Sequence, residues 1–116
     1  MNNNTVKSKK TSKEEKVMQF LITAFDGKDS EALDRRMAAR PNHLEYAKAA
    51  AAEGKVVIGG AILDDDGKMI GSMLVVEYPS KEAVEKEYLA NDPYFLGKVW
   101  QEVEIRPYRV ADIFNK

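Results

Sequence analysis

Apolar residues along the chain gather in four short runs that are rich in β-branched and aromatic side chains. The runs occupy residues 17–25, 56–63, 69–78 and 99–110. The first run stops at the turn dipeptide Asp26-Gly27, and the second and third flank the turn formers of residues 64–68. The last run alternates Val103 and Ile105 with charged residues, which is the period-two pattern of a half-exposed strand. The pattern therefore predicts four strands, of which the middle two form a β-hairpin.

Two stretches between these strands have helical character instead. Asp29 or Ser30 can cap a helix that runs through EALDRRMAAR to Pro41. Because proline removes a backbone donor and disfavours helical geometry in the residue before it, we expect an interruption there and a second helical piece beyond it. Ser80 can cap another helix through KEAVEKEYLAND, whose apolar residues recur at helical spacing.

The resulting order of elements is βαββαβ, the order of the ferredoxin-like split βαβ fold. In this α+β fold both helices cover one face of a four-stranded antiparallel sheet. In the first strand, however, apolar side chains alternate onto both faces, with Phe20 and Ile22 on one and Leu21 on the other. The next two strands share this two-sided pattern. Since the helices can cover only one face, we expect a second copy to cover the other, giving a homodimer or a higher homo-oligomer.

Composition excludes some classes of function and leaves the predicted fold unchanged. The 116 residues are 44% hydrophobic and 32% charged, and the formal net charge is −1. No basic surface is therefore predicted for nucleic acid or for an anionic membrane. We expect a single domain at residues 16–116 behind a flexible polar tail at residues 1–15, because the tail has almost nothing to bury. No apolar segment suits a signal peptide or a membrane span, so we expect a cytoplasmic protein.

The strand order is also that of RNA-binding RRM domains, but the chemistry of the sheet argues against RNA. Strand 69–78 carries aliphatic residues where base stacking would need aromatic rings. The expected partner is a small molecule.

His43 is the only histidine, and there is no cysteine. The lack of cysteine excludes disulfides, thiolate metal sites and cysteine nucleophiles, and carboxylates alone would have to complete a metal site, so we expect neither metal nor cofactor. As a general acid or base, His43 suits proton transfer near neutral pH, and a merely packed or surface histidine is the alternative. Asp92 can orient an imidazole, or it can simply cap the short segment that begins at Pro93.

Arg36 and Arg40 lie four residues apart and so can share one face of a helix. Their guanidinium groups could bind a carboxylate or phenolate substrate there. Surface ion pairs with Glu31 or Asp34 are an equal alternative. In the second strand, the glycine pair that ends at Gly60 marks the close approach of a ligand or of another backbone, and a bulge or tight packing is the alternative.

Taken in order, several of these segments resemble the YCII-related family, and the resemblance covers about residues 17–110. It rests on Arg36-Met37-Ala38-Ala39-Arg40-Pro41-Asn42-His43-Leu44, which looks like R-x-x-x-R-x-x-H-L, and on Gly60, Gly71-Ser72, Asp92-Pro93-Tyr94 and Arg106-Pro107-Tyr108. The resemblance implies a ferredoxin-like domain that dimerises into an α+β barrel. It also implies a pocket centred on His43 and Asp92, with substrate contacts from Arg36, Arg40, Gly60, Ser72 and Tyr94, and elimination-type chemistry on small ring compounds.

Two functional hypotheses follow. In the first, the protein is a cofactor-independent lyase-like or hydrolase-like enzyme. His43 transfers a proton, Asp92 orients it, and Arg36 or Arg40 holds an anionic or ring-containing substrate. In the second, the same pocket belongs to a dimeric module that binds a small molecule or has a structural role without catalysing a reaction.

Overall fold

A computed structural model of the protein describes residues 17–114, so the flexible tail predicted for residues 1–15 lies outside the described residues. The strands are β1 (Met18–Asp26), β2 (Val56–Leu63), β3 (Met69–Tyr78) and β4 (Trp100–Tyr108). The helices are α2 (Ala32–Ala52), α3 (Lys81–Ala83) and α4 (Pro93–Leu96), with a π-helical turn η1 (Val84–Tyr88) and 3-10 turns η2 (Leu89–Asn91) and η3 (Asp112–Phe114). The predicted order of strands and helical regions is confirmed.

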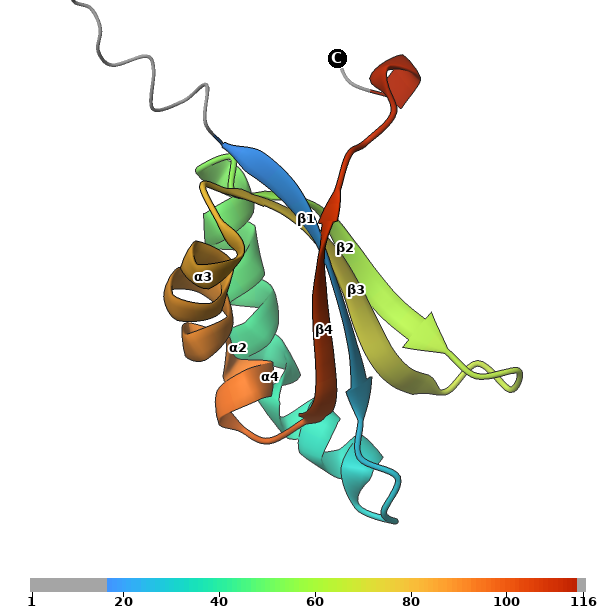
Figure 1. The fold of residues 1–116 in the computed structure, drawn as a ribbon. Coiled ribbons are helices and arrows are strands. Elements are labelled where there is room, and N and C mark those ends of the chain that lie inside the picture. The colour runs from blue at the N-terminus through green and yellow to red at the C-terminus, as the bar shows by residue number, and fades with distance from the viewer. Residues whose placement is uncertain (1–16, 115–116) are drawn as a thin grey trace, which may run out of the picture.

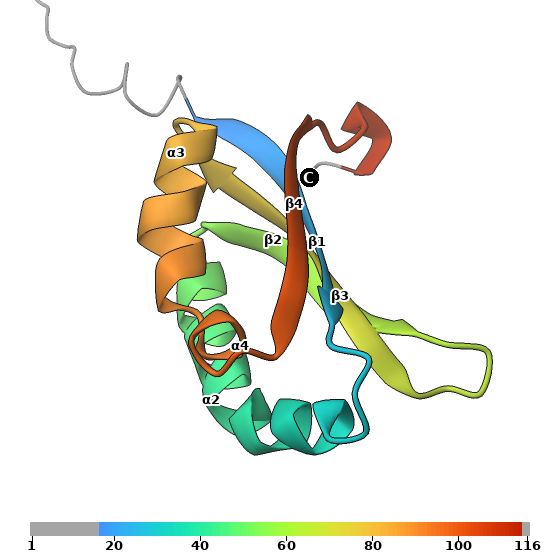
Figure 2. The same ribbon diagram turned by 60° about the horizontal axis from the view of Figure 1, so that its bottom comes forward.

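The four strands form one antiparallel sheet in the order β2-β3-β1-β4. β1 lies in the interior of the sheet and pairs with both β3 and β4. Helices α2, α3 and α4 all lie on the same side of this sheet (Figure 1 and Figure 2). The predicted ferredoxin-like α+β fold is therefore confirmed.

Alternate residues of β1 build the core beneath the helices. Phe20, Ile22 and Ala24 are at most 2% exposed. They belong to one apolar cluster with buried residues from the second helical region, among them Val84. Asp26 continues the same alternation and is buried as well. The end of β1 thus carries a charged group into the protein interior, which requires a partner for that charge.

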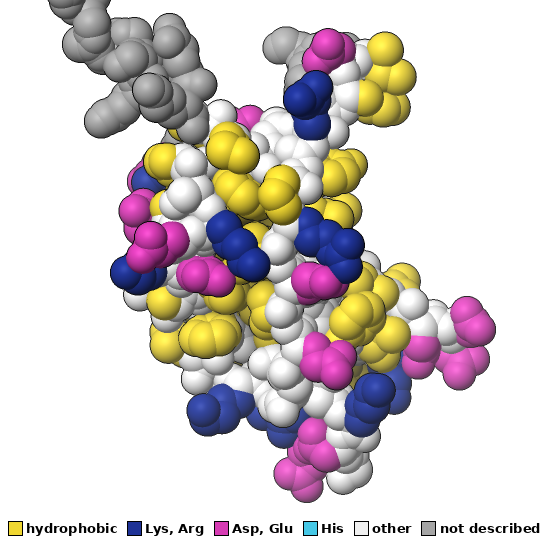
Figure 3. All heavy atoms as spheres, in the orientation of Figure 1, with side chains coloured by type: hydrophobic (Ala, Val, Ile, Leu, Met, Phe, Trp, Pro, Cys, Tyr) yellow, Lys and Arg dark blue, Asp and Glu magenta, His cyan; other side chains and the backbone are white. Residues whose placement is uncertain are grey.

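The opposite face of the sheet is apolar in its middle and charged along β4. Leu21 of β1 is paired with Val75 of β3 on one side and with Arg106 of β4 on the other. Ile58 of β2, which pairs with Val75, is 58% exposed. Figure 3 shows hydrophobic side chains at the surface next to the protruding hairpin, whose tip is acidic. The two-sided apolar pattern therefore leaves apolar area that no described helix covers.

α2 runs without a break over Ala32–Ala52, so the predicted interruption at Pro41 is wrong. The helix bends in its N-terminal half instead (Figure 2), as expected for a proline that removes one hydrogen bond from a helix interior. Buried Arg36 precedes the proline and buried His43 follows it, so both parts of the helix are anchored. Glu31 stands at the N-cap position without a side-chain hydrogen bond, but Asp29, one of the two predicted caps, accepts the Glu31 N–H through Oδ2 at 3.3 Å.

The second helical region is not one regular α-helix. Ser80 caps it as predicted, with Oγ accepting the Ala83 N–H at 3.0 Å, but η1 and η2 follow after one turn. A π-helical turn carries an extra residue and rotates the side chains that follow it around the axis. This turn ends at fully buried Tyr88 and leads to fully buried Asp92. None of the helices found between residues 17 and 114 is long and apolar enough to cross a membrane.

Candidate functional site

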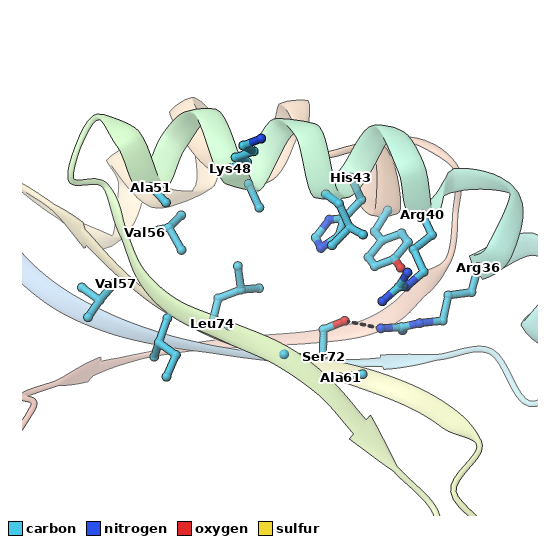
Figure 4. Close-up of a pocket in the computed structure, with 16 residues that line it drawn as sticks. Arg36, Arg40, His43, Lys48, Ala51, Val56, Val57, Ala61, Ser72 and Leu74 are labelled. Atoms are coloured by element: carbon cyan, nitrogen blue, oxygen red, sulfur yellow. Dashed lines mark hydrogen bonds between the residues drawn. The ribbon is translucent and has the colours of Figure 1, made fainter.

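His43 of α2 and Asp92, which directly precedes α4, meet in the interior. His43 Nδ1 lies 2.7 Å from Asp92 Oδ1, and the two side chains are 9% and 0% exposed. Because a carboxylate accepts hydrogen bonds, Nδ1 carries the ring proton and the neutral imidazole has its lone pair on Nε2. Nε2 has no hydrogen-bond partner within the described part of the chain, and the ring points into a cavity (Figure 4). This is the geometry of a general acid or base with an orienting carboxylate.

Asp92 fulfils both roles that its place in the sequence allows. Its Oδ1 also accepts the Tyr94 N–H at 2.9 Å, which makes it the N-cap of α4, with Pro93 in the first turn. The cap fixes the carboxylate, and the carboxylate in turn fixes the imidazole. Asp92 Oδ2 and the Tyr88 hydroxyl are buried without hydrogen-bond partners among residues 17–114. Burial raises the pKa of Tyr88, and the negative charge of Asp92 raises it further, so this phenol stays protonated beside the pair.

Arg36 is an anchored, buried cation and not a surface one. Its Nη1 donates to both carboxylate oxygens of Asp26, at 3.0 and 3.1 Å, and its Nη2 donates to Ser72 Oγ at 3.0 Å. Trp100 Nε1 donates to the same Ser72 oxygen at 3.1 Å. Since two donors occupy the lone pairs of that oxygen, the Ser72 hydroxyl retains its own proton for donation, and Ser72 lines the cavity.

An aromatic stack joins the arginine to the histidine. The Tyr94 ring lies 3.8 Å from the His43 ring, centroid to centroid, at an interplanar angle of 12°. The guanidinium carbon of Arg36 lies 4.6 Å from the Tyr94 ring centroid, a cation–π contact. Trp100 packs edge-on against both rings, at 5.7 Å from His43 and 5.5 Å from Tyr94. Burial raises the pKa of Tyr94, although the arginines oppose the shift, so a protonated phenol faces the cavity.

The cavity lies between α2 and the strands β2 and β3 and has a volume of about 320 Å³. Volumes of this order are typical of small-molecule sites. Arg40 lines it, is half-buried, and forms no ion pair with any described residue. Arg36 lines it too, whereas Asp26 and Asp92 do not. This end of the cavity therefore presents positive charge and hydrogen-bond donors, which suit an anionic oxygen.

Gly59 and Gly60 differ in what their lack of a side chain achieves. A Cβ atom at Gly59 would lie 3.2 Å from side-chain atoms of Leu74 and 3.2 Å from the Met73 carbonyl oxygen, whereas one at Gly60 would meet nothing within 4 Å. Both glycines line the cavity. Gly59 therefore permits tight packing on the cavity floor, and the backbone of Gly60 borders the cavity without such a constraint.

The site residues predicted from the sequence come together in space. Six of them line the one cavity, namely Arg36, Arg40, His43, Gly60, Ser72 and Tyr94. Asp92 lies in direct contact with His43 but outside the cavity wall.

Sequence reasoning missed three residues that support the site, Asp26, Tyr88 and Trp100. Asp26 had a usable signal, because it continues the buried alternation of β1, and a charge at a core position requires a buried partner. The interpretation of Asp26-Gly27 as a turn dipeptide does not predict that Asp26 is buried. Trp100 is the only tryptophan but stands in no motif. The sequence indicates only that Tyr88 follows Val84 at helical spacing. Its position near Asp92 depends on the tertiary fold.

Taken together, the cavity wall offers an imidazole, a phenol, a hydroxyl and two guanidinium groups. Within residues 17–114, no cluster of three or more His, Cys, Asp or Glu side chains is arranged to hold a metal ion. The groups present can take up or deliver a proton at Nε2 and can stabilise negative charge on a bound ligand.

Relatives of known sequence share most of the chain. Protein YciI of Escherichia coli is 30% identical over 98 residues, which are 79% of this chain and 97% of that protein. An Emericella nidulans protein called derivative of benzaldehyde biosynthesis cluster protein C is 35% identical over 79 residues, which are 61% of this chain and 80% of that protein.

Solved structures also share the fold. The 5-chloro-2-hydroxyhydroquinone dehydrochlorinase (TftG) of Burkholderia phenoliruptrix, in complex with 2,5-dihydroxybenzoquinone, matches with a TM-score of 0.70 at 27% identity. The match covers 84% of this chain and 100% of that one. A Bacteroides fragilis protein of ferredoxin-like fold matches with a TM-score of 0.50 at 13% identity, covering 82% of this chain and 97% of that one, which supports the fold alone.

The pattern that characterises the YCII-related domain matches residues 18–109, a range that begins with β1, ends just after β4 and includes every residue of the site. With that match and the E. coli relative in agreement, the chain belongs to the YCII-related family.

Proposed function

We propose that the protein is a cofactor-independent, general acid–base enzyme that acts on a small, anionic, hydroxylated ring compound. The observation that carries this proposal is the 2.7 Å contact between His43 Nδ1 and Asp92 Oδ1, made by a ring that lines a cavity with two arginines. A histidine that only filled space would need neither a buried carboxylate nor cations beside it.

In the proposed reaction, Nε2 of His43 takes the proton of a ring hydroxyl, so that an O–H bond breaks and an N–H bond forms. Asp92 stabilises the resulting imidazolium, and Arg40 stabilises the phenolate. The imidazolium then returns the proton to a ring carbon, which gives the keto tautomer. If that carbon carries a leaving group, a second ring hydroxyl then loses its proton. The electron pair left on its oxygen is transferred through the ring and breaks the bond to the leaving group. The net change is loss of one proton and one leaving-group anion, with no oxidant or reductant required.

The class of substrate is supported by similarity and by charge. The dehydrochlorinase to which this chain is 27% identical is described with a hydroxyquinone in its structure. Such compounds are acidic and planar, so their anions would suit Arg40 and the Ser72 hydroxyl, and their rings would suit the aromatic wall at Tyr94.

The test combines binding and turnover. We expect 2,5-dihydroxybenzoquinone to bind the purified protein in a calorimetric titration, and 5-chloro-2-hydroxyhydroquinone to release chloride in its presence. Arg40→Met should weaken binding of the quinone by roughly 10- to 100-fold, because a charge-assisted hydrogen bond contributes about 1.5–3 kcal/mol.

Lys86→Met is the matched control, since Lys86 is 73% exposed and lies outside the cavity lining. It removes the same charge and should leave binding unchanged. Absence of binding, or equal effects of the two variants, would contradict the proposal. Binding without turnover of any hydroxylated ring would favour the alternative of a non-catalytic binding module.

We also propose that two copies pair through the uncovered face of the sheet. Leu21 lies centrally on this face, between Val75 and Arg106, and Ile58 exposes more than half of its surface there. Apolar area of this kind is stabilised when a second copy removes it from water.

Leu21→Lys should shift the protein from dimer to monomer, as measured by size-exclusion chromatography with light scattering. Lysine places a charge at the centre of the proposed interface while its stem can still cover the sheet. Leu96→Lys is the control, because Leu96 belongs to α4 on the helical side and is already 63% exposed. A monomeric wild-type protein, or an unchanged dimer of Leu21→Lys, would overturn this arrangement.

A further inference from the structure

The cavity beside His43 has two chemically different halves, and we infer that its ligand is amphipathic. The ligand would be an anionic hydroxylated ring that carries an apolar substituent, such as an alkyl chain. This inference rests on the proposed function and adds to it the part of the substrate that does not react.

One wall of the cavity changes character along α2. Arg36, Arg40, His43, Ala47 and Ala51 follow one another at intervals of three or four residues, so they share one face of the helix, and all of them line the cavity. The charged and polar members come first, and the two alanines follow. Figure 4 shows this sequence along the helix, from Arg36 past His43 to Ala51.

The facing wall changes in the same direction. Ser72 lies opposite the arginine end and is hydrogen-bonded to Arg36 Nη2. Leu74, two residues further along β3, and Val56, at the start of β2, face the alanine end. Both walls are therefore polar at one end and apolar at the other. Polar residues thus face polar residues across the cavity, and apolar residues face apolar residues.

The groups at the apolar end are small or aliphatic, and its one charged neighbour is exposed. Lys48 borders this half from α2, and its exposure keeps the ammonium group in water while the stem borders the cavity. Gly59 also lines the cavity and packs so tightly that a Cβ atom there would lie 3.2 Å from side-chain atoms of Leu74. Among the described residues that line this end, no buried side chain offers a hydrogen-bond donor or acceptor.

A single hydroxylated ring would leave this half unused. The hydroxyl of the ring can reach Nε2 only if the ring lies near His43 and Ser72. The cavity, with its volume of about 320 Å³, extends away from these two residues toward Ala51 and Val56. Water in that half would face alanine, valine and leucine, which offer it no hydrogen bonds, so an apolar substituent would displace it favourably.

The test is a series of dissociation constants for 2,5-dihydroxybenzoquinone and its methyl, propyl and pentyl derivatives. Each methylene group that enters the apolar half should tighten binding by roughly three- to fourfold, the factor that corresponds to about 0.8 kcal/mol. The gain should level off when this half is full. Ala47→Leu should reduce the ratio between the constants of the unsubstituted and the pentyl compounds toward one.

Ala49→Leu is the control, because Ala49 is an exposed residue of the same helix that does not line the cavity, and it should preserve the ratio. Ala51→Leu, at an exposed position one helical turn further along the same wall, tests the same point if Ala47→Leu fails to fold, and should stop the gain at a shorter chain than in the wild-type protein. If the unsubstituted ring binds but substituents bring no gain, the inference is wrong and the proposed function stands. If no member of the series binds, the proposed function fails and the inference fails with it.

Discussion

Replacing His43 by glutamine is expected to lower turnover of a hydroxylated ring substrate by about 10²–10⁴-fold, the usual contribution of a positioned general acid or base. Glutamine can still accept or donate hydrogen bonds in the cavity but cannot take up the substrate proton. Binding of the ring should change far less than turnover, because Arg40 and Ser72 still contact its oxygen atoms in the proposed complex. Chloride release and calorimetric titration on the same preparation measure the two quantities separately.

Asp92→Asn is the companion variant that separates orientation from folding. Asparagine retains an oxygen that can accept the Tyr94 N–H and is itself a good N-cap residue, so α4 should persist. It removes the negative charge that stabilises the imidazolium, so turnover should still fall strongly. Turnover by the His43→Gln variant within a factor of about two of wild type would exclude a proton-transfer role for this histidine.

The second large effect is on stability, and it concerns Arg36. Arg36→Met should lower the free energy of unfolding by about 3–5 kcal/mol, because it leaves the Asp26 carboxylate buried without its counter-ion. Both side chains of this ion pair are only 3% exposed. The variant also removes the donor to Ser72 Oγ. Urea unfolding followed by circular dichroism measures the change.

The chain provides a matched control in the neighbouring arginine. Arg35 pairs with Asp29, whose pKa it lowers to about 2 mainly through a hydrogen bond, but the two side chains are 29% and 54% exposed. Arg35→Met should therefore change stability far less, since solvent screens this pair. The double variant Asp26→Leu with Arg36→Met should be more stable than Arg36→Met alone, because it removes the uncompensated charge. Equal effects of the two single variants would show that the buried pair has no special energetic role.

The sequence alone could predict which residues belong to the candidate site, but it could not predict how they contact one another. Its motif segments supplied His43, Asp92 and the two arginines, because each falls at a recognisable spacing. The choice between alternatives needed the tertiary structure. Asp92 proved to be both a cap and the partner of the imidazole, and Arg36 pairs with Asp26 instead of its helical neighbours. Local spacing cannot distinguish these partners, since they come from other elements of the fold.

The sequence by itself determined the fold of this protein. The strands β2 and β3 occupy the predicted ranges, and β1 and β4 differ from them only at their ends, because period-two alternation and turn residues are local properties of the chain. The path of α2 through Pro41 was decided by tertiary structure, since buried residues on both sides of the proline outweigh the loss of one hydrogen bond. The network from Asp26 through Arg36, Tyr94 and His43 to Asp92 was decided there too. Burial makes each of these contacts strong, and burial arises only when the helices pack on the sheet.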